Sequence, residues 1–193
     1  MTEAIFRVSF PDNLITPNPD VPGAVANANI DIKKWYDLVL IQMSTLQSCF
    51  KTRFGFISIV INKGYVTHIK FLKSHKQKEN LKFSVIKKQI KEFLKGQRKK
   101  LNFKYKINGS KNQLSVWREI KKIPYGKTIS YNSIAKKLSL NPRNVGRICG
   151  QNKLLLYIPC HRVIRSNGSL GGYSSKGGIS LKEKLLKVER LNK

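Results

Sequence analysis

The sequence is short of cysteine, of acidic residues and of long apolar runs. Its 193 residues contain no stretch near the roughly 18–20 consecutive apolar residues of a membrane-spanning helix, and the N-terminus lacks the basic, apolar and small-residue order of a secretory signal. Three cysteines are too few for a disulfide framework, and no Cys-x-x-Cys pair is present. These absences exclude membrane-spanning, disulfide-dense and collagenous classes, and they favour a reducing, intracellular compartment.

The few acidic residues are also unevenly distributed. Residues 1–45 carry five acids and three bases, a net charge of −2, whereas residues 46–193 carry five acids and 35 bases, a net charge of +30. Lysine-rich codon usage accounts for many of the lysines but not for the absence of aspartate after Asp37. Because a surface this positive concentrates polyanions around it, the charge favours a nucleic-acid partner.

The N-terminal segment differs in composition from the rest of the chain. Residues 1–30 hold four of the seven prolines, and proline interrupts both helix interiors and strand ladders. This stretch therefore predicts a loop or flexible arm. The apolar run at 36–42 could form a buried strand. We treat residues 1–45 as an extension of unknown role.

Residues 46–108 are predicted to form a small α/β domain. Two β-rich runs within 54–72 flank Asn62-Lys63-Gly64, and asparagine and glycine tolerate the positive φ of a tight hairpin turn. The segment 81–96 spaces its apolar residues three or four apart and ends on a glycine, as an amphipathic helix does. A further short strand is predicted at 104–107.

Residues 109–193 are predicted to be mostly helical. Apolar spacing indicates helices over 112–123 and 130–140, and an Asn-Pro pair near residue 141 marks the start of a third. Helix, short turn and helix in a basic setting is the helix-turn-helix outline, in which the later helix reads DNA. A last helix is predicted over 179–191.

The most informative run is Pro159-Cys160-His161-Arg162-Val163. Positive neighbours stabilise the thiolate, which is the nucleophilic form of cysteine. The glycine-rich segment 166–178 lets backbone come close to a flat ligand, and Glu189 on the last helix could reach a histidine. Each feature has a plain structural alternative, because a lone cysteine is more often a small buried residue and adjacent residues in a strand point apart.

The C-terminal 85 residues resemble the O6-alkylguanine-DNA alkyltransferases, also called methylated-DNA–protein-cysteine methyltransferases. The resemblance rests first on the run from Pro159 to Val163 and on Asn152, eight residues before the cysteine. Further matches follow in chain order: Val116-Trp117, 123–128, Ser130-Tyr131, Ile134-Ala135, Arg143, Val145-Gly146, 172–174, Lys182, Leu185, Leu186 and Glu189. Residues 46–108 match more loosely, and residues 1–45 match nothing recognised.

The resemblance implies both a fold and a reaction. The fold is an RNase H-like α/β N-terminal domain over 46–108, a small antiparallel sheet plus a helix, followed by a mostly helical, winged helix-turn-helix-like catalytic domain over 109–193. The implied reaction is DNA repair by direct reversal. O6-alkylguanine is flipped out of duplex DNA, and its alkyl group is transferred irreversibly to Cys160, once per molecule.

The resemblance also assigns catalytic roles to five residues. Cys160 matches the acceptor, His161 the base that takes the thiol proton through water, and Glu189 the group that orients this histidine. Asn152 matches the residue that holds the active-site hydrogen bonds. Tyr131 matches the tyrosine that crowds the 3′ phosphate and hydrogen-bonds the flipped base.

Two further groups of candidate residues follow from the same resemblance. Arg143 matches the arginine that fills the space left by the flipped base, and neighbours on its helix are expected to contact DNA: Asn144, Gly146 and Arg147. The expected substrate pocket is formed by Cys149, Val163, Tyr173 and Ser174.

The chain departs from the family pattern at positions that bear on substrate range and rate. Lys153 replaces the usual proline after Asn152, Cys149 stands where an apolar pocket wall is common, and Asn144 is bulkier than usual. Three other functions stay open from the residues alone. They are a non-catalytic lesion-binding protein, although such relatives lack the acceptor cysteine, a DNA-binding regulator, and a thiol hydrolase whose remaining groups are unplaced.

We expect a monomer that binds double-stranded DNA through the minor groove and has no membrane partner. It would be cytoplasmic in a prokaryote and nuclear in a eukaryote. No cofactor is expected, because the product thioether is stable and no step regenerates the cysteine. No metal ligand is assigned, and zinc in the N-terminal domain stays an open but unsupported alternative, since Cys49, His68 and His75 are too scattered to indicate a zinc site.

Overall fold

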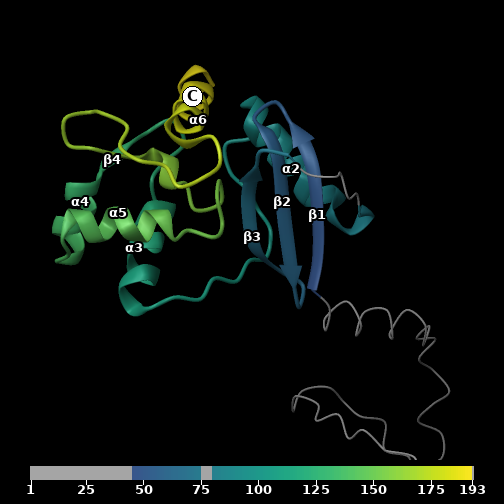
Figure 1. Ribbon diagram of the computed structural model, residues 1–193, viewed down its shortest axis with the longest axis horizontal. Coiled ribbons are helices and arrows are strands. Elements are labelled where there is room, and N and C mark those ends of the chain that lie inside the picture. The colour runs from purple at the N-terminus through teal and green to yellow at the C-terminus, as the bar shows by residue number, and fades with distance from the viewer. Residues whose placement is uncertain (1–44, 75–79, 193) are drawn as a thin grey trace, which may run out of the picture. The chain divides into compact units, whose positions relative to one another are not determined.

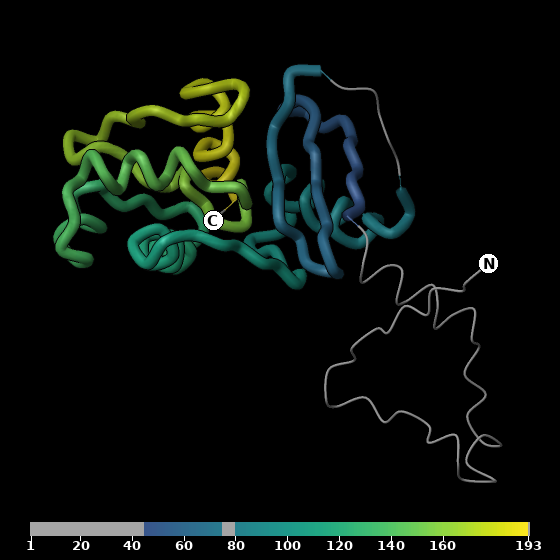
Figure 2. Tube along the Cα trace, turned by 60° about the horizontal axis from the view of Figure 1, so that its bottom comes forward, coloured from purple at the N-terminus to yellow at the C-terminus, as the bar shows by residue number. Residues whose placement is uncertain are grey.

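The computed structural model describes residues 45–74 and 80–192. The predicted arm at 1–30 and the predicted strand at 36–42 lie outside these residues. Figures 1 and 2 show that the described chain begins with a sheet and a helix and continues into a mainly helical part. The broad fold prediction, a small antiparallel sheet followed by helices, is confirmed.

Three antiparallel strands form the sheet, in the order β1 (Thr45–Thr52), β2 (Gly55–Asn62) and β3 (Tyr65–Leu72). The predicted hairpin is β2–β3, and its turn places Lys63 and Gly64 at φ of 49° and 75°. This left-handed backbone is inexpensive for glycine, which explains the residue type at the turn. β1 was not predicted, because its sequence TLQSCFKT has no regular apolar alternation.

A helix packs against this sheet. A short 3₁₀ turn, η1 (Leu81–Phe83), leads into α2 (Ser84–Lys95), which ends at Gly96 with φ of 83° as predicted. Two lysine ammonium groups of α2 lie 5.6 and 6.0 Å from the centre of the Phe50 ring on β1. The predicted strand at 104–107 is reduced to a single bridge between Tyr105 and Val66, because only one residue of this segment pairs with β3.

The helical part begins with α3 (Lys111–Lys121), α4 (Tyr131–Leu138) and α5 (Pro142–Gly150). The residue before each helix, respectively Ser110, Ser130 and Asn141, accepts a hydrogen bond from a backbone N–H of the first turn. Ser130 and Asn141 are the predicted caps, whereas Ser110 was not predicted as a cap and α3 begins one residue before its predicted start at residue 112.

The chain then forms the segment that holds the cysteine. A 3₁₀ turn, η2 (Cys160–Arg162), leads into β5 (Val163–Ile164), which pairs in parallel with β4 (Ile129–Ser130) just before α4. This pairing fixes the cysteine segment beside the start of α4. The last helix is α6 (Gly178–Leu191), whose Leu181 and Leu185 are buried as predicted, while Val188 is only half-buried.

Backbone hydrogen bonds connect the sheet to the cysteine segment. The Ile69 N–H on β3 donates to the Lys153 carbonyl at 2.8 Å, and the Leu155 N–H donates to the Ile69 carbonyl at 3.3 Å. The buried side chains of both parts also form one continuous apolar cluster. No helix among residues 45–74 and 80–192 is long and apolar enough to cross a membrane.

Candidate active site

Cys160 lies at the first position of η2, where its side chain is 3% exposed. The Asn152 Nδ2 group donates to the Cys160 sulfur at 3.3 Å and also to the Ile158 carbonyl at 2.8 Å. The Asn152 Oδ1 atom in turn accepts from the Leu154 N–H at 2.9 Å. Asn152 is therefore held at both ends of its amide, and its N–H group is fixed toward the sulfur.

The sulfur is not sealed in the core, because Cys160 lines an open cavity of about 750 Å³. The cavity lies between the start of α4, one side of α5 and the glycine-rich segment before α6. Besides Cys160 itself, its lining includes six residues that the sequence analysis suggested for catalysis, DNA contact or the pocket: Tyr131, Arg143, Gly146, Cys149, Tyr173 and Ser174. A cavity of this size accommodates a purine base.

Burial raises the pKa of the Cys160 thiol, while hydrogen bonds to the sulfur and a positive charge act in the opposite direction. The hydrogen bond from Asn152 and the positive charge of Lys182 both lower the pKa of this thiol. The sequence analysis expected the positive neighbours His161 and Arg162 to stabilise the thiolate, and this expectation was wrong. Both side chains are turned toward Glu189, so the cation that acts on the sulfur comes from α6.

Lys182 is a site residue whose role the sequence analysis did not identify. Its side chain is fully buried, and its ammonium group donates to the carbonyls of Val163 at 2.6 Å, of Gly172 at 3.5 Å and of Leu170. Burial lowers the pKa of Lys182 to about 8, while the thiols of the two cavity cysteines oppose this shift. The only sequence signal was its place in the family match.

Tyr131 is a further hydrogen-bond partner of Lys182. Its hydroxyl oxygen accepts a hydrogen bond from the Lys182 ammonium group at 3.4 Å. Burial raises the pKa of Tyr131 to about 12, so the phenol stays protonated at neutral pH. The hydroxyl can therefore donate its proton into the cavity while it accepts from lysine.

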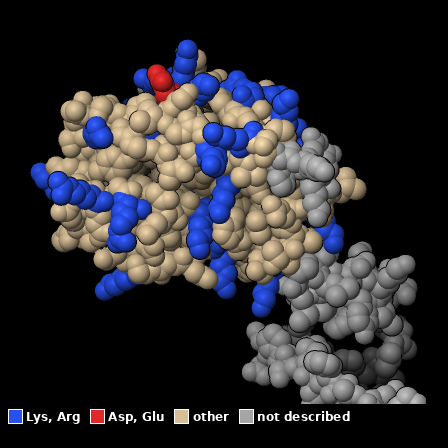
Figure 3. All heavy atoms as spheres, viewed as in Figure 1, with Lys and Arg blue, Asp and Glu red and all other residues tan. Residues whose placement is uncertain are grey.

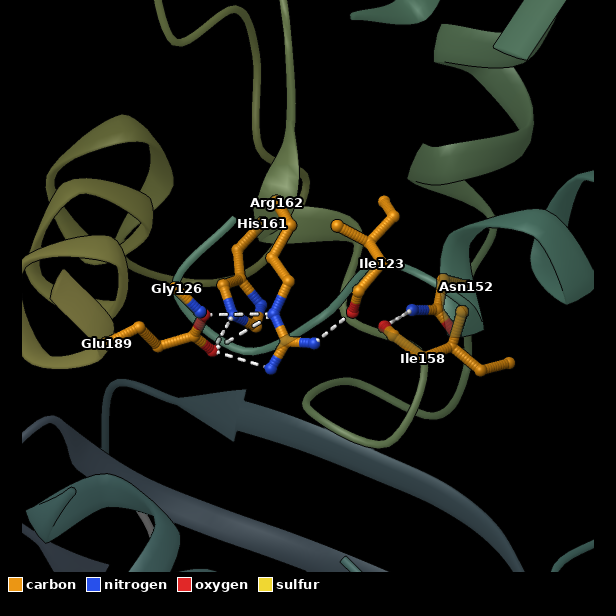
Figure 4. Close-up of polar contacts among 7 residues, drawn as sticks. All are labelled: Ile123, Gly126, Asn152, Ile158, His161, Arg162 and Glu189. Atoms are coloured by element: carbon orange, nitrogen blue, oxygen red, sulfur yellow. Dashed lines mark hydrogen bonds and ion pairs between the residues drawn. The ribbon is translucent and has the colours of Figure 1, made fainter. Parts of the chain in front are cut away.

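Glu189 on α6 lies at the centre of a buried network (Figure 4). Its carboxylate accepts from the His161 Nε2 atom at 2.8 Å, from the Gly126 N–H at 3.0 Å and from two nitrogens of Arg162 at 2.9 Å each. Arg162 also donates to the Ile123 carbonyl at 2.6 Å. Burial raises the pKa of Glu189, but the hydrogen bonds and charges of His161 and Arg162 outweigh it and lower the pKa to about 2.

This network fixes the protonation state of His161. Burial lowers the pKa of His161, and the charge of Arg162 lowers it further, although Glu189 acts in the opposite direction. Because the carboxylate of Glu189 accepts a hydrogen bond, the Nε2 atom carries the proton of the neutral ring. The Nδ1 atom is then a buried acceptor, and it has no partner among the described residues.

Comparison with known proteins identifies the family to which this arrangement belongs. Residues 111–191 match the model of the 6-O-methylguanine DNA methyltransferase DNA-binding domain. A methylated-DNA–protein-cysteine methyltransferase of Metallosphaera sedula is 32% identical over 143 residues, which span 72% of this chain and 90% of that protein. The chain belongs to the methylated-DNA–protein-cysteine methyltransferase family. The Methanosarcina acetivorans methyltransferase is 41% identical over 110 residues, 55% of this chain and 69% of its own length.

Solved structures of Mycobacterium tuberculosis alkyltransferases have the same fold as this methyltransferase-family chain. OGT in complex with DNA superposes with a TM-score of 0.69 at 28% identity, over 76% of this chain and 93% of that chain. The O6-methylguanine methyltransferase of the same organism gives a TM-score of 0.67 at 27% identity, over 78% and 95% of the two chains. Both alignments extend beyond the helical part.

The residues of α5 that the sequence suggested for DNA contact are divided between the cavity and the outer surface of this methyltransferase. Arg143 is exposed and lines the cavity together with Gly146. Asn144 and Arg147 do not line it, and instead the Arg147 guanidinium donates to the Asn144 side-chain oxygen at 3.0 Å. The helix therefore presents one face to the cavity and another to solvent.

The four suggested pocket residues also differ in position. Cys149 and Tyr173 lie in the cavity wall, and burial raises the pKa of both side chains well above its ordinary value. The exposed Ser174 lies beside them, and its hydroxyl donates to the Gly150 carbonyl at 3.0 Å. Val163 is fully buried in the core and is not among the cavity-lining residues.

The described residues show no cluster of three or more His, Cys, Asp or Glu side chains that could hold a metal ion. Cys49 lies on β1 and His68 on β3, and His75 lies outside the described residues.

Proposed function

We propose that this methyltransferase-family protein repairs O6-alkylguanine in DNA by transferring the alkyl group to its own Cys160. One observation carries the assignment of the acceptor: the Cys160 sulfur borders an open cavity, and a fixed amide N–H and a buried ammonium group act on it. A thioether is chemically stable, so we propose that each molecule acts once. The activity is that of a methylated-DNA–protein-cysteine S-methyltransferase.

The resting thiol must lose its proton before it attacks, because burial raises its pKa. We assign this proton to His161, whose Nδ1 atom is an unpartnered acceptor and whose Nε2–H is held by Glu189. A water molecule would carry the proton between the two residues. The imidazolium that forms is stabilised by the Glu189 carboxylate, as the third group of a triad stabilises its histidine.

The transfer step forms one bond and breaks another. The thiolate sulfur attacks the alkyl carbon in line, the new S–C bond forms, and the electron pair of the C–O6 bond remains on the guanine oxygen. A hydrogen bond or proton to the purine makes guanine a better leaving group. We assign this role to the Tyr131 hydroxyl, which stays protonated and is held by Lys182.

Duplex DNA must release the damaged base before the base can enter a cavity of this kind. We propose that α4 and α5 form a winged helix-turn-helix-like unit that binds the minor groove, with Arg143 filling the vacated space. Asn144, Gly146 and Arg147 would contact the flanking backbone. The position of Arg143 at the cavity supports this assignment, since it connects the helix surface to the site of chemistry.

The rest of the architecture is proposed by the same reasoning. Residues 46–108 would form an RNase H-like domain that supports the cysteine segment through β3, and residues 109–193 would form the catalytic domain. The backbone bonds between Ile69 and the segment 153–155 support this role for the sheet. We propose that the protein acts as a monomer, without metal or cofactor.

Mass spectrometry of the reacted protein tests the proposal directly. Incubation with a duplex that contains O6-methylguanine should add one methyl group, in stoichiometric yield, to the peptide that contains Cys160. The Cys160→Ala variant should bind the duplex and gain no methyl group, whereas Cys149→Ala should still be methylated at Cys160. Methylation of Cys160→Ala would refute the assignment, and binding without any transfer by the native protein would indicate a lesion-binding protein instead.

A further inference from the structure

A second groove, separate from the alkyl-transfer cavity, lies along the turn end of the β2–β3 hairpin. Its volume is about 440 Å³, and it shares no lining residue with the cavity. Three exposed lysines border it, one from each of three chain segments: Lys63, Lys106 and Lys153. Lys153 is the residue that replaces the family's usual proline after Asn152.

Backbone hydrogen bonds hold these segments at the free edge of β3. The Val66 N–H donates to the Lys104 carbonyl at 2.9 Å and the Val66 carbonyl accepts from the Lys106 N–H at 3.0 Å. Ile69 makes the corresponding pair of bonds with the segment that begins at Lys153. The positions of the lysine backbones are therefore set by the fold.

A β-bulge lies between these two attachment points. Val60 pairs with His68 and Ile61 with Val66, so Thr67 is an extra residue on β3. A bulge redirects side chains and interrupts regular pairing. Here Thr67 and His68 both line the groove, and the His68 Nδ1 atom lies 3.1 Å from the Thr67 hydroxyl.

Three of the nine residues that line the groove are lysines, and none of the nine is acidic. The chain has no aspartate or glutamate at 45–74, 93–118 or 120–182, the ranges that supply every residue of the groove. Burial lowers the pKa of His68, and the charges of Lys70 and Lys153 lower it further. Figure 3 shows the same imbalance on one face of the molecule, where blue side chains are widespread and red is confined to one place.

We propose that this groove is a second phosphodiester-binding site, which holds the backbone of a DNA strand outside the alkyl-transfer cavity. The proposal rests on the proposed function only in taking DNA as the polyanion. Three separate ammonium groups at an open groove suit successive phosphates of a strand better than a single enclosed phosphate. Tyr65, which is 42% exposed, gives the groove an apolar wall against which a sugar or base can lie.

The salt dependence of binding to unmodified DNA tests this site. The triple variant Lys63→Gln, Lys106→Gln, Lys153→Gln should reduce the slope of log K against log salt by about 2–3, since each neutralised phosphate contributes roughly 0.9 in duplex and 0.7 in single-stranded DNA. A matched control removes three exposed lysines elsewhere on the N-terminal part: Lys51, Lys82 and Lys88. Both variants should be measured by fluorescence anisotropy with single-stranded and duplex oligonucleotides.

Two further measurements make the outcome decisive. The corresponding triple Lys→Arg variant keeps the charges and should restore the native slope, which would separate loss of charge from misfolding. NMR should show the pKa of His68 rising when DNA binds the native protein, because phosphates offset the neighbouring lysines. A slope reduction no larger than that of the control on both DNA forms would overturn the proposal.

A separate assay tests the proposed repair function independently of the second groove. Mass spectrometry of Cys160 after incubation with a duplex that contains O6-methylguanine reports on the cavity. Absence of methyl transfer by the native protein in that assay would refute the repair function and leave the DNA-binding comparison intact.

Discussion

Replacing Glu189 by glutamine tests the buried network that positions His161. The native carboxylate is 1% exposed and accepts hydrogen bonds from His161, Arg162 and Gly126. Glutamine is nearly isosteric, but it removes the negative charge opposite a buried guanidinium. The variant therefore leaves Arg162 without a charge partner, which is costly in a site that excludes water.

The size of the effect follows from the pKa of Glu189. This pKa falls from an ordinary value of 4.5 to about 2 in the folded protein, a shift that corresponds to about 3 kcal/mol of stability at neutral pH. Because the folded pKa is depressed, this stability is fully present above pH 4.5 and is lost as the pH falls toward 2. Glu189→Gln should thus cost about 3 kcal/mol at pH 7 and roughly half as much or less at pH 3.

Urea unfolding of both proteins at several pH values between 7 and 3 measures this difference. Glu183→Gln is the matched control, because this exposed glutamate lies on the same helix and its replacement should change stability by less than about 0.5 kcal/mol. Alkyl transfer by Glu189→Gln should also slow, since the imidazolium loses its compensating charge. A difference in stability that stays constant from pH 7 to pH 3 would refute the reasoning.

Three further perturbations have definite expected outcomes. Lys182→Met removes the cation that lowers the Cys160 pKa. The rate at which iodoacetamide alkylates Cys160 should therefore increase at higher pH values than in the native protein. An unchanged pH profile would contradict the role of this lysine. Iodoacetamide should label Cys160 before Cys149, because the Asn152 amide donates a hydrogen bond to the Cys160 sulfur and stabilises its thiolate, whereas Cys149 has no such amide donor among the described residues. Peptide mapping that shows the opposite order would contradict this prediction. Gly96→Ala should destabilise the fold by about 1–2 kcal/mol in urea unfolding, because the φ of Gly96 is 83° and an added Cβ atom would lie 2.4 Å from the Asn192 side chain. Native-like stability of this variant would contradict the prediction.

Local signals in the sequence were sufficient for the secondary elements that have a regular pattern. The β2–β3 hairpin, α2 with its terminal glycine, the helix α3, and the capped starts of α4 and α5 could all be predicted, because each depends on neighbours within a few residues. β1 could not be predicted, since its residues alternate irregularly and pairing with β2 stabilises it. The segment 104–107 was predicted as a strand from its residue pattern, but in the structure it makes only one bridge to β3.

The sequence by itself determined the reactive chemistry: a cysteine within a family-specific run, an asparagine eight residues earlier, and a chain with a large excess of positive charge. Only the tertiary structure decided which cation acts on that cysteine. Lys182 lies 22 residues away in the chain and reaches the site from α6, while the adjacent His161 and Arg162 turn toward Glu189. Electrostatic effects depend on separation in space and on burial, and neither quantity can be read from distance along the chain.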